Sequence, residues 1–395
     1  MGKLIPKDGK VAVRMYRHGL GDCFLLAFPA EGKKPFYMLI DCGVILGTED
    51  APGKMRKVAR DLHSATGGDI HLLVATHEHW DHLSGFIQAR EAFEKLTIHH
   101  LWMAWTEDPK DELANRLRKR HQKEKEALRL AIARASATHS VQHISEVLNF
   151  FGEPAALAAA GENTTASALD LIRGFVAKGG GKPAYLRPGE GPLDFPQVGG
   201  VGRVQGARIF VLGPPRCEKT LRKINPSAKH QETYHENKAA MRATDTFLAA
   251  AIPEDSPLFD PDLKERSYPF DKRLCVPLKQ AKRTSFFKAR YGIGLDNHPE
   301  AWRKIDDDWL GTAGELALAL DSYTNNTSVA LAIELLPGRE VLLFVADAQV
   351  GNWLSWEKQD YPAAEGDPAK RITAADLLGR TTLYKVGHHG SHNAT

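Results

Sequence analysis

The sequence is poor in cysteine, and its cysteines have none of the paired spacings that cysteine-based sites use. The four cysteines, Cys23, Cys42, Cys217 and Cys275, are scattered over 395 residues. No two of them form a CxxC pair, so the sequence indicates neither a disulfide framework nor a thiolate zinc site. This usage is typical of proteins kept in a reducing compartment, and we expect a cytoplasmic protein.

Long apolar runs and a strong charge of one sign are also missing. No run reaches the ~18 residues of a membrane span, and residues 1–10 lack the apolar core of a signal peptide. The net charge of +3, with a pI near 8.5, is too small to argue for nucleic-acid binding and does not exclude it. With 43% hydrophobic and 26% charged residues, the chain is expected to be soluble, with a sizeable core and no membrane span.

One stretch, residues 76–82, reads Thr-His-Glu-His-Trp-Asp-His. It follows an apolar run at 70–75 that is typical of a buried strand, and it precedes a helix-like pattern over 83–96. Three imidazoles and a carboxylate are therefore expected on a strand-to-helix turn. Such ligand types at fixed spacing indicate a metal site.

The spacing within this turn suits two neighbouring ions. His77 and His79 are two residues apart, so they point to the same side of an extended chain. Asp81 and His82 follow on the turn and can face the same cavity from another side. We expect His77 and His79 to supply one ion, and Asp81 and His82 to supply the other.

The rest of the chain favours an α/β architecture with two insertions. Strands are expected at 11–16, 24–28, 36–40, 70–76, 97–104, 208–212, 329–335, 340–345 and 381–386, with a helix at 52–64. The early β-α-β-α-β run predicts helices that cover a sheet. We interpret residues 1–395 as a single domain with a helical insertion at 106–181 and a proline-rich, irregular, lid-like insertion at 216–310.

Further ligand-type residues follow strands far along the chain. Asp347 comes directly after the strand expected at 340–345 and is the candidate for a carboxylate that bridges the two ions. His388 and His389 follow the strand at 381–386, and adjacent residues at a strand end point in opposite directions. We favour His388 as the ligand and His389 as a substrate contact or proton donor. Asp41, at another strand end, suits a supporting role that fixes the tautomer of a ligating histidine.

Several short motifs, taken in order, carry a resemblance to a known family. They are His18-Gly-Leu-Gly-Asp22-Cys23, Leu39-Ile-Asp41-Cys42-Gly43, Thr76 to His82, Leu212-Gly-Pro-Pro215, Asn325-Asn-Thr-Ser328, Leu343 to Ala348, and Lys385-Val-Gly-His-His-Gly-Ser391. The series resembles the hydrolase domain of ComEC-type competence proteins, a branch of the metallo-β-lactamase superfamily. The resemblance implies a four-layer αββα sandwich with two divalent ions, zinc or manganese. It also implies hydrolysis of phosphodiesters, in nucleic acid or in small molecules.

One position departs from the wider superfamily. Most members have a further histidine just before the penultimate strand, but residues 324–328 read Thr-Asn-Asn-Thr-Ser. One ion is then poor in ligands and is completed by water, by Asn326, or by a histidine of the insertion such as His139 or His143. Such a site favours metals that accept oxygen and water, such as manganese. The chain also ends inside a ligand-rich motif, which predicts a fragment that lacks a short closing segment.

Three functions fit these residues. The leading hypothesis is an enzyme in which a metal-bound hydroxide attacks a phosphodiester, with Asp81 and His389 as the candidate catalytic residues. The second keeps the metals but acts on a lactone, thioester or other carboxylic ester. The third is a binding module on the same scaffold, without turnover.

Overall fold

The computed structural model describes most of the chain, and its contacts divide it into two compact units. The described residues are 2–7, 9–32, 34–134, 145, 147–152, 164–223, 238–267, 272–295, 299, 308–362 and 371–391. Unit 1 comprises Met1–Arg120, Val147–His235 and Ala319–Thr395, and unit 2 comprises His121–Glu146 and Glu236–Leu318. This division differs from a single domain with insertions at 106–181 and 216–310, because part of each predicted insertion belongs to unit 1.

The first sheet of unit 1 has six strands in the order β1-β2-β3-β4-β5-β6. They are β1 (Ala12–Met15), β2 (Phe24–Phe28), β3 (Phe36–Ile40), β4 (Asp69–Ala75), β5 (Thr97–Ala104) and β6 (Pro183–Leu186). The pairs from β1 to β3 are antiparallel, and those from β3 to β6 are parallel. The carboxyl ends of β3, β4 and β5 therefore lie at one edge of this sheet.

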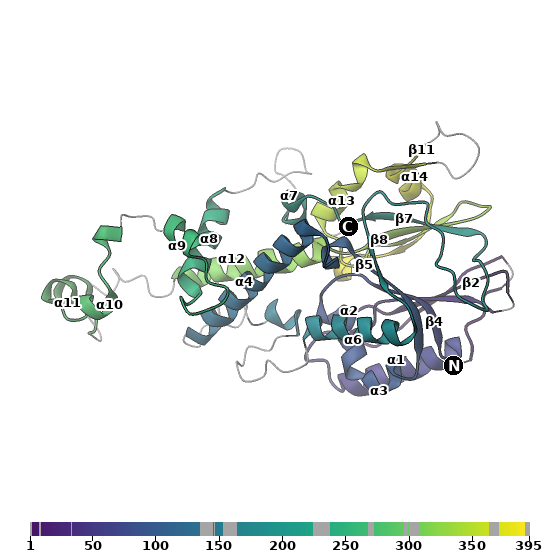
Figure 1. Ribbon diagram of the computed structural model, residues 1–395, viewed down its shortest axis with the longest axis horizontal. Coiled ribbons are helices and arrows are strands. Elements are labelled where there is room, and N and C mark those ends of the chain that lie inside the picture. Colours follow the sequence, from purple (N-terminus) through teal and green to yellow (C-terminus); the bar gives the residue numbers. More distant parts are fainter. Residues whose placement is uncertain are drawn as a thin grey trace. The chain divides into compact units, whose positions relative to one another are not determined.

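Helices cover one face of this sheet (Figure 1). They are α1 (Ala51–Thr66), α2 (Trp80–Gln88), α3 (Arg90–Phe93) and α6 (Thr165–Lys178). In α1 the buried Met55, Val58, Ala59 and Leu62 repeat every three to four residues, which aims one stripe at the sheet. The Asp50 side chain accepts a hydrogen bond from the Gly53 amide and caps the first turn.

The second sheet of unit 1 has four strands in the order β12-β9-β8-β7. They are β7 (Ala207–Gly213), β8 (Ala330–Leu335), β9 (Val341–Phe344) and β12 (Thr381–Lys385). Strand β12 pairs parallel with β9, and the other pairs are antiparallel. The face of this sheet that carries Phe210 and Leu343 packs on Trp356, on Tyr361 of the hairpin strand β10 (Asp360–Pro362), and on Leu377 of α14 (Ala374–Gly379).

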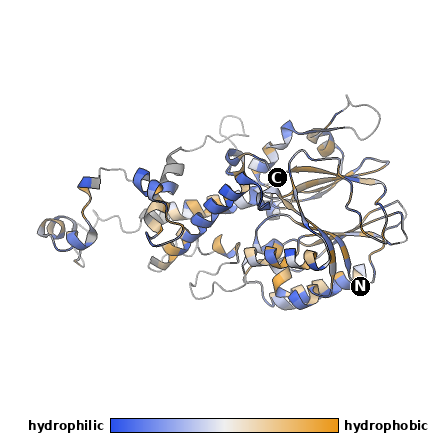
Figure 2. Ribbon diagram, in the orientation of Figure 1, coloured by the Kyte–Doolittle hydropathy of each residue, from blue (hydrophilic) through white to orange (hydrophobic). Residues whose placement is uncertain are grey.

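The remaining faces of the two sheets form one shared core. Phe28 and Met38 of the first sheet lie in the same buried cluster as Ile209 and Ile333 of the second. Both sets of strands carry hydrophobic residues in Figure 2. The order of layers in unit 1 is thus helices, sheet, sheet, helices, and the protein is a mixed α/β protein.

Unit 2 is helical where the structure describes it. It contains α8 (Lys238–Ala251), α9 (Pro261–Ser267), α10 (Leu278–Ala281) and α11 (Ser285–Tyr291), with residues 121–134 of α4 (Glu112–Arg134) and 308–318 of α12 (Asp308–Asn326). The sequence pattern predicts an irregular segment over much of this region because it is rich in proline. Pro261 instead occupies the first turn of α9, where a missing amide hydrogen costs nothing.

Two local differences from the sequence-based expectation matter for the site. The helix after residue 76 begins at Trp80 rather than Leu83, so Asp81 and His82 lie in its first turn. Helix α6, expected in the insertion, packs its apolar side into the core under the first sheet. Residues 155–160, which the sequence pattern also predicts to be helical, lie outside the described residues. None of the described helices combines the length and apolarity that crossing a bilayer requires.

Candidate metal centre

The turn between β4 and α2 buries its three histidines side by side. His77, His79 and His82 are each at most 4% exposed. The ring of His77 lies 4.8 Å from that of His79 and 4.2 Å from that of His82, measured between ring centroids. The three rings therefore form one buried cluster, and the site around them is called the cavity here.

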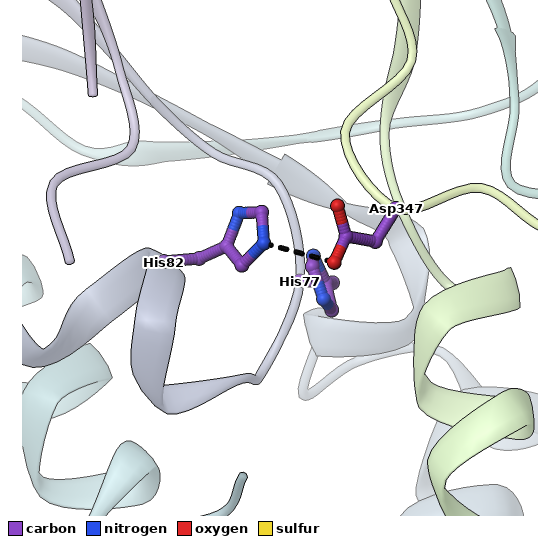
Figure 3. Close-up of side chains that lie close together, drawn as sticks. All are labelled: His77, His82 and Asp347. Carbon is purple, nitrogen blue, oxygen red and sulfur yellow. Dashed lines mark ion pairs between the residues drawn. The ribbon is translucent and has the colours of Figure 1, made fainter. Parts of the chain in front are cut away.

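Asp347 reaches this cavity from the second sheet. It follows β9, and its Oδ2 atom lies 3.2 Å from His82 Nε2 (Figure 3). Its Oδ1 atom accepts a hydrogen bond of 3.2 Å from the His388 amide, and its own amide donates to Ser328 Oγ. His77, His82 and Asp347 place ligand atoms within 4.8 Å of one another. The structure therefore brings together residues from both sheets.

Asp81 lies beside His82 in the same buried site. The backbone around Asp81 is tightly packed. Its Oδ2 atom is 3.7 Å from His82 Nε2. A Cβ atom on Gly21 would lie 2.6 Å from the Asp81 carbonyl oxygen, and one on Gly43 would lie 2.6 Å from the His82 amide nitrogen. Real Cβ atoms do not approach that closely, so glycine at both positions lets two loops pack against the turn.

Asp41 fixes the orientation of His82 through the ring nitrogen that does not face Asp347. Its Oδ2 atom is 2.8 Å from His82 Nδ1, and its two oxygens also accept from the amide and hydroxyl of Thr76 at 2.9 and 2.6 Å. A carboxylate at Nδ1 holds the proton there, which leaves Nε2 facing Asp347. Burial raises the pKa of the Asp41 carboxyl, although the neighbouring His82 opposes this shift.

His388 lies between two amide side chains. Asn325 Nδ2 is 3.2 Å from its Nε2 atom, and Gln349 Nε2 is 3.2 Å from its Nδ1 atom. A neutral imidazole accepts at only one nitrogen, so one of these amides must present its oxygen instead. Asn325 Oδ1 and Gln349 Oε1 are both buried without a hydrogen-bond partner. The side chain of His389 lies outside the described residues, and its assignment as a proton donor or substrate contact stays a prediction.

The predicted supporting residue Asn326 does not face the cavity. Its amide nitrogen donates to the Leu221 and Lys223 carbonyls at 3.0 and 2.9 Å, and its oxygen accepts from the Asn352 amide at 3.0 Å. Successive residues of a helix are rotated by roughly 100°, so the neighbouring Asn325 faces the site instead. The insertion histidines His139 and His143 lie outside the described residues.

The structure adds two residues near Asp347 that sequence reasoning missed. Asp22 and Lys385 form an ion pair, and the Lys385 ammonium lies 3.5 Å from Asp347 Oδ1 and donates to the Ala346 carbonyl. Burial would lower the pKa of Lys385, but Asp22 and Asp347 raise it overall, so the amine is charged. Asp22 looks like a turn residue in the sequence, because Gly19 and Gly21 precede it. Its only other signal is its place in the first motif of the family resemblance.

Asp321 is a third residue missed by sequence reasoning. It lies on α12, and its Oδ1 atom is 3.7 Å from His79 Nε2. The available signal was the spacing of Asp321 and Asn325, which are four residues apart and so share one helix face.

The electrostatics of the cavity suit a divalent cation. Burial, then His82 and His79, hold the pKa of His77 well below its ordinary value, and burial lowers the pKa of His79 to about 4. Both rings are therefore neutral near pH 7, and the Nε2 atom of each is buried without a hydrogen-bond partner. Buried polar atoms without a partner are rare, and a neutral imidazole nitrogen beside carboxylates is a good ligand for a divalent metal ion.

His82 differs from these two histidines. Burial alone would lower its pKa, but Asp347, Asp81 and Asp41 raise it well above its ordinary value. The extra proton on His82 therefore lies at a position where three carboxylates attract positive charge. A second grouping, Asp22, Asp41 and His82, is better explained by hydrogen bonds and ion pairs, because Asp41 already binds His82 Nδ1 and Lys385 pairs with Asp22.

Comparisons with protein-family models, with curated proteins and with solved structures found no match to this chain. The case for a function therefore depends on the geometry and chemistry of this cavity.

Proposed function

We propose that this protein is a metal-dependent hydrolase of the metallo-β-lactamase superfamily, in its ComEC-like branch. The observation that supports this most is the convergence of Asp347 on His82, at 3.2 Å, beside the buried and unpartnered nitrogens of His77 and His79. Helices outside two packed sheets, with ligands at the edge, are what an αββα sandwich of this superfamily would have. The order of motifs along the chain agrees with this reading.

In this proposal the cluster would hold two neighbouring divalent ions, zinc or manganese. His77 and His79 would hold one, Asp81, His82 and His388 would hold the other, and Asp347 would supply carboxylate oxygens beside His77 and His82. When bound, such ions supply Lewis acidity, which makes water nucleophilic near neutral pH and stabilises negative charge on a substrate oxygen.

The chain's own groups prepare the cavity for this chemistry. Asp41 holds His82 in the tautomer whose Nε2 atom faces Asp347. Lys385 offsets part of the carboxylate charge and lies 3.5 Å from Asp347 Oδ1, whereas His82 lies near Oδ2. The rings of Phe150 and Phe151 lie 5.7 and 5.0 Å from that of His79 and place apolar side chains beside it. Apolar surroundings lower the local dielectric constant, which strengthens charge interactions.

The substrate that we propose is a phosphodiester, in a nucleic acid or a small molecule, and this choice depends on the motif resemblance. A direct test measures bound zinc and manganese together with turnover of bis-p-nitrophenyl phosphate. His79→Ala and Asp81→Ala should lose both metal and turnover. His99→Ala, on the same sheet beside Asp69, is the matched histidine control and should lose neither.

Each other outcome has a definite meaning. Full phosphodiester turnover in Asp81→Ala would rule the mechanism out. Turnover of a lactone, thioester or p-nitrophenyl ester in place of the phosphodiester would keep the metal chemistry and change the substrate class. Bound metal without turnover of any of these substrates would leave a binding module on the same scaffold.

A further inference from the structure

Residues 324–328 contain no histidine, so one of the two expected ions is poor in protein ligands. The structure places a carboxylate near His79. Asp321 comes from the last part of α12, and its Oδ1 atom lies 3.7 Å from His79 Nε2. The His79 side chain is 2% exposed and that of Asp321 is 17% exposed, so the carboxylate lies nearer to solvent than the imidazole.

The distance between His79 Nε2 and Asp321 Oδ1 suits two ligands of one metal ion better than a hydrogen bond. At 3.7 Å it is too long for a hydrogen bond, and His79 Nε2 has no hydrogen-bond partner at all. Two ligand atoms that each lie about 2.1 Å from one metal ion are separated by roughly 3 to 3.5 Å, since metal–ligand angles are near 90° to 110°. A small movement of the carboxylate therefore places both atoms on one ion.

Asn325 holds the Asp321 carboxylate in this orientation. Its Nδ2 atom donates to Asp321 Oδ2 at 3.3 Å, which leaves Oδ1 turned toward His79. The same amide lies 3.2 Å from His388 Nε2. Asn325 thus connects the residue that faces His79 with the histidine expected at the neighbouring ion.

The helix itself favours a cation at this place. α12 ends at Asn326, so Asp321 and Asn325 belong to its final turns. The carbonyl end of a helix carries a partial negative charge, which attracts a cation near the last turn. The helix end and the carboxylate thus act in the same direction.

We propose that Asp321 is an oxygen ligand of the ion expected at His79. A set of two imidazoles and carboxylate oxygens is harder than a set of three imidazoles, so this site takes manganese more readily than a three-histidine site would. This inference rests on the proposed metal centre and adds a ligand to it.

The test measures metal binding directly, by titration calorimetry and elemental analysis with Mn²⁺ and Zn²⁺ added separately. In Asp321→Asn the Mn²⁺ affinity should fall at least ~10-fold, since even loss of a supporting contact to a metal ligand costs 10- to 100-fold. In Asp321→His the ratio of Zn²⁺ to Mn²⁺ affinity should rise above that of the wild type. The visible spectrum of the Co²⁺-loaded protein should change in both variants, because it reports the ligand set.

Controls separate this inference from the function on which it rests. Asp170→Asn removes a carboxylate from the exposed side of α6, where it pairs with Arg173, and should leave both affinities unchanged. The losses in Asp321→Asn and His79→Ala should not add in the double variant, because the two residues share one ion. If the wild type binds neither metal, the metal centre itself fails. If the wild type binds metal while Asp321→Asn matches it in affinity and Co²⁺ spectrum, only the assignment of Asp321 is overturned.

Discussion

The two ends of strand β8 both bury carboxylates, but they neutralise them in different ways. At one end the fully buried Glu334 meets the guanidinium groups of Arg208, Arg339 and Arg380. At the other end Asp347 lies near Asp22, Asp41 and Asp81. Lys385 is the permanent cation that the described contacts place among these carboxylates.

The difference distinguishes a cluster that is neutralised within the chain from one that we propose binds metal. Around Glu334 the chain supplies more cations than the carboxylate needs, so the cluster is complete without a ligand. Around Asp347 carboxylates outnumber the permanent cation, and two of the neighbouring histidines are neutral. Uncompensated buried charge is costly. A divalent cation from solution would remove that cost, and this is the physical reason to expect one here.

Removing one carboxylate from the unbalanced cluster should have the largest effect on function and little on stability. In Asp81→Asn we expect turnover to fall at least ~1000-fold, about 4 kcal/mol at 1.36 kcal/mol for each tenfold. The metal-free variant should melt no lower than the metal-free wild type, because like charges repel less. Zn²⁺ or Mn²⁺ at 100 times its dissociation constant should stabilise the wild type by about 2.7 kcal/mol and the variant by much less. Thermal unfolding with and without metal measures this, and equal metal stabilisation in both proteins would contradict it.

Removing the carboxylate from the Glu334 cluster should have the opposite outcome: a loss of stability without a loss of metal. Glu334→Gln leaves three guanidinium groups around a neutral side chain, and loss of one partner from a buried ion pair costs roughly 3 kcal/mol of unfolding free energy. Metal content should stay at the wild-type level. Urea unfolding and elemental analysis of the same preparation test both halves of this prediction. Lost metal with unchanged stability would reverse the roles assigned to the two clusters.

The stabilising effect of Glu334 should also depend on pH. Burial alone would raise the pKa of Glu334, but Arg208, Arg380 and Arg339 lower it below its ordinary value of 4.5. A lowered pKa in the folded state means that the carboxylate stabilises the fold fully above that ordinary value. This contribution is lost as the pH falls through the lowered folded value. The difference in unfolding free energy between wild type and Glu334→Gln should therefore be constant from pH 7 to 5 and shrink below it. A difference that grows in acid would contradict the ion-pair account.

The smallest expected effects come from two glycine substitutions, one beside the candidate metal site and one far from it in sequence, in α6. Gly43→Ala would place a Cβ atom 2.6 Å from the His82 amide nitrogen, so the turn must shift, at a cost of about 1–3 kcal/mol. Metal affinity should fall with it, because His82 and Asp81 move. Gly174→Ala, inside α6, meets no atom within 4 Å and should stabilise the protein by up to ~1 kcal/mol. Melting temperatures and Zn²⁺ titrations of the pair make the test, and equal effects would show that packing at Gly43 is unimportant.

Local patterns in the sequence were sufficient to predict much of the first sheet and the turn that carries the histidines. The strands at 24–28 and 36–40 are found with the predicted bounds, and α1 and β4 begin and end within a few residues of prediction. Each is short and strongly apolar or periodic, so neighbours along the chain determine it. β6, β10 and β11 (Arg371–Thr373) were not predicted, because each is three or four residues long and depends on its pairing partner.

The same contrast holds within the site. His77, His79, Asp81 and His82 could be identified from the sequence because their spacing is local, and the direction of a side chain on a strand or in a first helical turn follows from that spacing. Asp321, Asn325 and Lys385 could not, since each has an ordinary structural explanation until the fold places it beside the cavity. Asn326 was the predicted residue, but Asn325 faces the site, because a sequence does not show which face of a helix meets it.

The sequence by itself determined which residue types are available for chemistry, and it determined the one turn that concentrates them. Only the tertiary structure decided which distant carboxylates join that turn and which are neutralised by arginine elsewhere. The physical reason is that the charge balance of a buried cluster is a sum over neighbours in space. Those neighbours come from both sheets and from α12, and no spacing along the chain encodes them.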